Sequence, residues 1–173
     1  MKKFFIIIIL FTLASNVTLK SQEKYSRVLN LGLGLGYYGY LGGSIPVIHA
    51  NYELDVARNF TLAPFISFYR YNSDYYWKGT SHYSVVVIPI GVKGSYYLDE
   101  FFLVNDKWDI YLGGSLGINI SWENNYVGER KPYNRANNLY LDINIGAEYK
   151  VNSRIGIFLD LSSGVSTIGI ALH

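Results

Sequence analysis

Seven ionisable side chains alternate with apolar residues in extended stretches of the chain. They are His49, Glu53, Lys93, Asp109, Asp142, Glu148 and Asp160. Carboxylates, an amine and an imidazole can transfer protons or hold an ion, provided that the fold brings them together. A strand repeats every two residues, so each of these side chains falls on the face opposite the aliphatic ones. We interpret them as a buried polar network, in which Lys93 must meet carboxylates because unpaired buried charges are costly.

The histidines and serines carry little catalytic signal. His49, His82 and His173 lie on separate segments, without the close spacing of metal ligands. His82 lies next to Ser81 and near Ser84, and a serine hydrolase would add an acid to such a pair. No serine, histidine and acid set matches a known signature. We therefore expect no catalytic residue, no metal and no cofactor.

Two further chemistries are disfavoured. The chain contains no cysteine, which excludes disulfides and thiol catalysis. Residues 34–39 fit the letters G-x-G-x-x-G, but a dinucleotide site needs a helix directly after that turn. The residues that follow, 42–46, read G-G-S-I-P. The glycines are therefore interpreted as small residues that line an interior.

Aromatic and basic residues gather in two segments, 72–82 and 121–138, where turn-forming residues interrupt the strand pattern. The candidate binding residues are Tyr75, Tyr76, Trp77, Trp122, Tyr126, Arg130, Tyr133 and Arg135. Tyrosine, tryptophan and arginine are enriched in binding hot spots. The alternative is that these loops only pack on one another or form a solvated rim.

The elements that must position these residues are strands. Leu31, Leu33 and Leu35 alternate with Gly32 and Gly34, and similar alternation returns along the whole chain. It predicts eight strands, at residues 26–38, 47–54, 60–71, 83–98, 108–120, 139–150, 155–162 and 165–172. Pro64 lies within the third strand and predicts a bulge or a local gap in pairing.

The first residues have the pattern of a secretory signal peptide. Lys2 and Lys3 precede an apolar core that ends in small and polar residues. We predict a signal peptide at 1–21 with cleavage after Ser21, the alternative being Ser15, and a single domain at 22–173. Without Lys2, Lys3 and Lys20, the 15 basic residues fall to 12 against 13 acidic ones. The resulting charge of −1 argues against nucleic-acid binding.

The direction in which the apolar and the charged side chains face distinguishes a membrane barrel from a soluble one. The branched aliphatics would face outward and the charged residues inward, which suits lipid outside and a narrow, packed interior. Long connections (39–46, 72–82, 121–138) tend to alternate with short ones (55–59, 151–154), and 99–107 is an exception on the short side. The fold predicted is all-β, an eight-stranded antiparallel up-and-down transmembrane β-barrel. Aromatic girdles are expected at the two interfaces, formed by Tyr37, Tyr38, Tyr69, Tyr71, Tyr83, Trp122 and Tyr140 at one end and by Phe60, Tyr96, Tyr97, Trp108 and Tyr149 at the other.

Two segments carry a resemblance to a known family. They read Y-E-L-D-V-A-R-N-F-T-L-A-P-F-I-S (52–67) and I-P-I-G-V-K-G-S-Y-Y-L (88–98). With the signal peptide and eight alternating strands, they resemble the small outer-membrane β-barrels of Gram-negative bacteria, which include OmpA-type and OmpX-type domains and opacity-like proteins. One departure is the end of the chain, where His173 stands in place of the aromatic residue usual in such barrels.

The resemblance implies an integral outer-membrane protein without enzymatic activity, which acts structurally or binds a surface ligand or host surface through its loops. It also implies contact with outer-membrane lipids and lipopolysaccharide, no nucleic acid, and a monomer. Some barrels of this kind modify lipid A, so an enzyme is one alternative. A narrow pore past Lys93, Asp109 and Asp142 is a second, and a soluble periplasmic barrel with an apolar lumen is a third.

Overall fold

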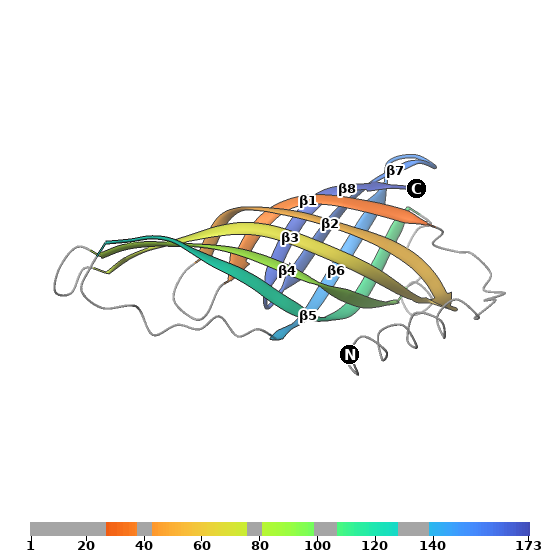
Figure 1. Ribbon diagram of the computed structural model, residues 1–173. Coiled ribbons are helices and arrows are strands. Elements are labelled where there is room, and N and C mark those ends of the chain that lie inside the picture. Colours follow the sequence, from red (N-terminus) through yellow and green to blue (C-terminus); the bar gives the residue numbers. More distant parts are fainter. Residues whose placement is uncertain (1–26, 38–42, 76–80, 99–106, 128–138) are drawn as a thin grey trace, which may run out of the picture.

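The computed structural model describes residues 27–37, 43–75, 81–98, 107–127 and 139–173, and these form one closed antiparallel barrel (Figure 1). Neighbouring strands follow one another in chain order. The strands are β1 (Val28–Tyr37), β2 (Gly43–Ala57), β3 (Phe60–Tyr75), β4 (Ser81–Tyr97), β5 (Trp108–Val127), β6 (Leu139–Lys150), β7 (Ile155–Ser162) and β8 (Val165–Leu172). Pairing of β1 with β8 closes the barrel. The predicted signal peptide, 1–21, lies outside the described residues.

Three strands are clearly longer than the sequence predicts. β2, β3 and β5 have 15, 16 and 20 residues against 8, 12 and 13 predicted, β4 has 17 against 16, and β7 and β8 have 8 each. The predicted loops 72–82 and 121–138 therefore begin or end as strand, and so does 39–46 from Gly43 on. The extra residues pair mainly with each other, as Asp74 does with His82. Cross-strand partners stabilise polar strand residues in a way that a single segment does not reveal.

The two faces of the barrel differ as predicted. The outward positions carry aliphatic rows, with Ile143 74% exposed and Leu141 66% exposed. The inward positions carry polar and charged side chains, of which Lys93 and Glu53 are 4% and 2% exposed. No helix in the described ranges is long and apolar enough to cross a membrane.

Pro64 of β3 and Pro89 of β4 each lie at an interruption of a ladder. The β2–β3 pairing skips from Asn51–Phe65 to Leu54–Leu62, which confirms the gap predicted at Pro64. Pro89 of β4 faces the lumen and lies opposite a similar gap in the β3–β4 pairing. A proline ring has no N–H to donate, so the ladder loses a bond at each site.

Three aromatic residues assigned to the girdles point into the lumen instead. Tyr69 and Tyr97 are 3% exposed and Tyr140 is 8% exposed. Their position near a strand end suggested the interface, but the side of the strand is decided by the alternation, which points all three inward. Outward aromatic residues remain at the inner end, where the rings of Trp108 and Tyr149 lie 5.0 Å apart.

Candidate functional site

The centre of the lumen holds an ion pair between two strands on opposite sides of the barrel. Lys93 of β4 pairs through its Nζ with Asp160 of β7. Asn144 of β6 donates from Nδ2 to the other carboxylate oxygen at 2.7 Å, and the Tyr111 hydroxyl of β5 lies 3.4 Å from Asp160 Oδ2. The ammonium also lies 4.7 Å from the centre of the Tyr111 ring. Four strands are thereby linked at one level of the lumen.

Closer to the inner end, a second carboxylate is held by neutral donors. Glu53 accepts hydrogen bonds from Asn30 Nδ2 at 2.8 Å, Thr61 Oγ1 at 3.1 Å and the Tyr97 hydroxyl at 2.7 Å. These donors come from β1, β3 and β4, so one side chain of β2 ties together four consecutive strands. Three donors can satisfy a buried carboxylate without a cation in contact.

A chain of side-chain hydrogen bonds sets the state of His49. Asn30 Nδ2 also donates to Asn51 Oδ1 at 3.0 Å, which turns the Asn51 amide nitrogen toward His49 Nε2 at 3.0 Å. Nε2 must therefore accept, and Nδ1 carries the proton that is donated to Ser67 Oγ at 2.7 Å. This arrangement holds the imidazole neutral.

At the outer end, Asp142 anchors the β7–β8 hairpin. Its Oδ1 accepts from Ser163 Oγ at 2.7 Å and from the Gly164 backbone N–H at 2.8 Å, while its Oδ2 accepts from the Tyr140 hydroxyl at 3.0 Å. A short turn is thereby fixed to the neighbouring strand β6.

The inner mouth is lined by two further contacts. Glu148 Oε1 lies 2.7 Å from His173 Nε2, and Asp109 Oδ2 lies 2.6 Å from Lys150 Nζ. The two carboxylates are on adjacent strands at paired positions. The predicted polar residues thus all face the lumen, but they form separate groups at different levels, and Lys93 and Asp160 pair directly with each other.

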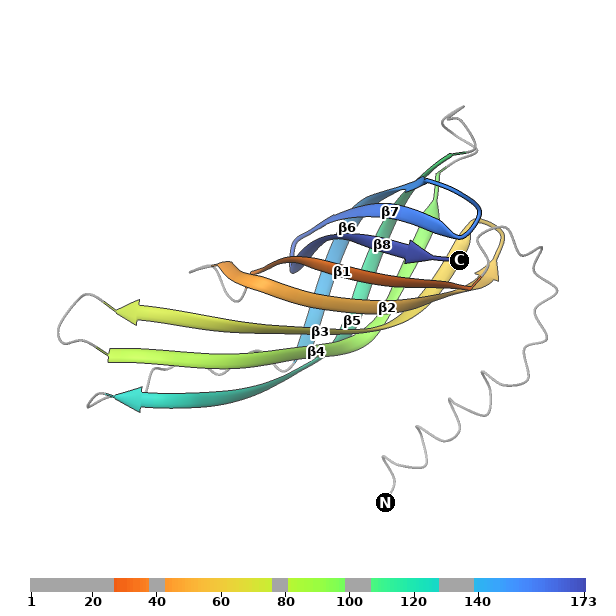
Figure 2. The same ribbon diagram turned by 90° about the horizontal axis from the view of Figure 1, so that it is seen from above.

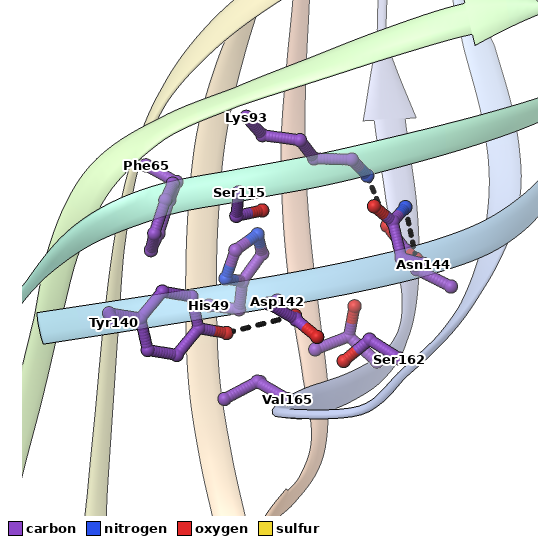
Figure 3. Close-up of a pocket in the computed structure, with 11 residues that line it drawn as sticks. His49, Phe65, Lys93, Ser115, Tyr140, Asp142, Asn144, Ser162 and Val165 are labelled. Atoms are coloured by element: carbon purple, nitrogen blue, oxygen red, sulfur yellow. Dashed lines mark hydrogen bonds and ion pairs between the residues drawn. The ribbon is translucent and has the colours of Figure 1, made fainter.

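The space between these groups is small. A cavity of about 20 Å³ lies between His49, Lys93, Asp142 and Asp160 (Figure 3). A cavity of this size has room for about one water molecule and for no organic substrate. The described residues include no group of three His, Cys, Asp or Glu side chains that could hold a metal ion.

Glycines make room for large lumen side chains. A Cβ at Gly146 would overlap the Tyr111 ring, one at Gly164 would lie 2.8 Å from the Tyr140 hydroxyl, and one at Gly32 would lie 3.0 Å from the Phe158 ring. Tyr111, Tyr140 and Phe158 therefore fit in the lumen because glycines lie beside them. The sequence reasoning missed Asn30, Asn51, Tyr97 and Asn144 as network members, although their inward alternation could have found them.

Comparison with known proteins gives a match in fold alone. The chain matches no protein-family model and no curated protein. Among solved structures, Neisserial surface protein A aligns at 16% identity over 84% of this chain and 94% of that chain, with a TM-score of 0.50. The chain has the fold of a small outer-membrane β-barrel.

Two further solved structures align with this outer-membrane barrel over 84% of its length. A de novo designed transmembrane β-barrel aligns at 12% identity over 93% of its chain, with a TM-score of 0.49. Ail, the attachment invasion locus protein of Yersinia pestis, solved with the heparin analogue sucrose octasulfate, aligns at 7% identity over 92% of its chain, with a TM-score of 0.40.

The perimeter of the outer-membrane barrel agrees with its fold. Rows of leucine and isoleucine on every strand face outward, and hydrocarbon is the solvent that such rows require. Closure in chain order leaves no edge within the apolar band, where lipid could not hydrogen-bond a free backbone. The barrel therefore has the perimeter of a membrane-spanning protein.

The predicted binding residues of the outer-membrane barrel are only partly described. Trp122 is at an outward position near the end of β5 and is 53% exposed. Tyr75 and Tyr126 belong to the strands β3 and β5, not to loops as predicted. The remaining candidates lie outside the described residues, namely Tyr76, Trp77, Arg130, Tyr133 and Arg135.

Proposed function

We propose that this outer-membrane barrel is a non-enzymatic, non-conducting protein that binds a surface ligand through its outer end. The observation that carries the proposal is the unequal height of the barrel, since β3, β4 and β5 extend well beyond the other strands (Figures 1 and 2). We further propose that residues 1–21 are removed as a signal peptide and that the protein acts as a monomer.

The outer parts of β3 and β5 extend past the described ladders with their second neighbours, β2 and β6. The described β2–β3 pairing ends at Phe68, and the described β5–β6 pairing ends at Ile118. Beyond these points, β3 and β5 are edges of a three-stranded sheet in the described part of the chain. Edge strands can pair with an extended segment of another polypeptide. The exposed Trp122 on β5 adds a side chain of the type found in binding hot spots.

The contacts inside the lumen favour a closed, non-conducting barrel rather than a pore. The Lys93–Asp160 pair and its neighbours cross the interior, and the cavity beside them has room for about one water molecule. Ion conduction would need these contacts to break.

The contact between Ser67 and His49 does not support an enzymatic function. The imidazole donates its proton to Ser67 Oγ, whereas a catalytic histidine accepts one from the serine. Ser67 is also 1% exposed, so no lipid substrate reaches it.

Cell adhesion and conductance test the proposal. Bacteria that display the wild-type barrel should adhere to a protein-coated surface better than bacteria without it, and Trp122→Ala should reduce that adhesion at least severalfold. Trp108→Ala is the matched control, because Trp108 is 44% exposed at the inner end. The purified protein should show no discrete conductance steps in planar bilayers. Equal adhesion of both variants would refute binding at the outer end, and steady channel steps would refute the closed lumen.

A further inference from the structure

Arg70 is the one charged residue on the outward face of the strands, among the positions whose side chains the structure describes. The outward residues around it on β3 are Leu62, Pro64, Ile66 and Phe68, and the other strands present aliphatic, aromatic or small residues. An arginine facing the middle of a bilayer costs about 2–4 kcal/mol, whereas near the interface the cost falls to about 0–1 kcal/mol. The position of Arg70 along the strand therefore matters.

Strand geometry puts Arg70 at the outer interface. The stretch from Phe60 to Arg70 climbs roughly 25 Å at a rise of about 3.3 Å per residue and a tilt of about 40°, which equals the height of the apolar band. Phe60 starts β3 at the inner end of the barrel.

A tryptophan lies in the same cross-strand row as Arg70. Arg70 pairs with Val86 on β4, and Val86 pairs with Trp122 on β5, so the three residues form one outward row. Neighbouring strands lie about 4.8 Å apart, which puts the backbones at Arg70 and Trp122 about 10 Å apart. The row combines a guanidinium and an exposed indole above the exposed ring of Phe68.

We propose that this row binds the phosphorylated headgroup of a lipid A-type glycolipid in the outer leaflet, with Arg70 on a phosphate and the acyl chains along the β3–β4 surface. The guanidinium recognises phosphate through paired, charge-assisted hydrogen bonds. Arg70 already takes part in an interaction within the protein, and its five N–H donors allow a phosphate to be added beside it. This inference rests on the outer-membrane function proposed above and names one lipid partner and its site.

Native mass spectrometry of the folded barrel tests the inference. The protein is inserted into phosphatidylcholine nanodiscs that contain bis-phosphorylated lipid A, the same lipid without phosphates, or phosphatidylglycerol. The wild-type protein should retain bis-phosphorylated lipid A, and Arg70→Gln should lower its affinity about tenfold. Arg70→Lys should lose less, because it keeps the charge but not the paired donors.

Arg58→Gln is the matched control, since Arg58 is exposed in the β2–β3 turn at the inner end, and it should leave retention unchanged. Equal retention by Arg70→Gln and wild type would overturn the site. Equal retention of dephosphorylated lipid A or phosphatidylglycerol would overturn the lipid assignment. Heat-modifiable migration of every variant separates these results from a failure of the membrane function, in which the wild-type protein itself would not fold into the bilayer.

Discussion

Asp160 and Glu53 are both buried in the lumen, but they are stabilised in different ways. Asp160 meets the ammonium of Lys93 across the barrel, whereas the described contacts of Glu53 are with an amide and two hydroxyls. A charge pair in a low-dielectric interior depends on both partners, because removing one leaves the other uncompensated. A carboxylate held by several neutral donors depends less on any one of them. The two levels of the lumen should therefore respond differently to substitution.

The largest effect is expected from Lys93→Met. It removes the cation and leaves the Asp160 carboxylate buried with Asn144 and Tyr111, which should destabilise the barrel by about 3–5 kcal/mol. Urea unfolding of the barrel in lipid vesicles, followed by tryptophan fluorescence, measures the loss. Adding Asp160→Leu should recover most of it, because the unpaired charge is then gone. No recovery in the double variant would mean that the lysine acts through packing instead.

A packing substitution at the same level should have an intermediate effect. The side chain in Gly146→Leu would overlap the buried Tyr111 ring and push it away from Lys93 and Asp160, at a cost of about 1–3 kcal/mol. The same unfolding assay measures it. Gly114→Leu is the matched control, because a Cβ at Gly114 meets only a backbone oxygen at 3.5 Å on the exposed face. Equal losses for the two variants would contradict the role assigned to the ring.

Glu53→Gln should cost less, about 1 kcal/mol, because hydroxyl donors can rotate to accept from the new amide. The unfolding free energy in vesicles is again the measurement. Glu53→Leu, which removes the carboxylate that accepts from Asn30, Thr61 and Tyr97, should cost clearly more. If Glu53→Gln were as damaging as Lys93→Met, the distinction between the two levels of the lumen would be wrong.

The smallest effect is expected at the inner mouth. His173→Ala removes a contact to Glu148 whose histidine side chain is 15% exposed, and such a partly solvated pair contributes about 0–1 kcal/mol. A thermal shift in detergent would detect the change, with His173→Gln as the variant that keeps a hydrogen-bond donor. A loss comparable to that of Lys93→Met would make the inner mouth part of the structural core.

Much of this molecule can be predicted from the residues alone. The alternation of leucine with glycine and asparagine in residues 29–36 already assigns each side chain to a face, and the same argument places Asp142 and Ile143 on opposite faces. Strand number and antiparallel order followed from the same alternation and from the turn residues between the strands. The outer ends of β3 and β5 did not follow, because the residues there are mainly polar and aromatic and are held by partners in β4.

What the sequence by itself determined is the side of the wall on which each residue lies, because a two-residue period is a local property of the chain. Only the tertiary structure decided which residues meet across the lumen. Lys93 and Asp160 are separated by 67 positions and by two intervening strands, and they meet because the closed barrel sets the stagger of all eight strands at once. The projection of one side of the barrel likewise depends on how neighbouring strands pair, which no single segment specifies.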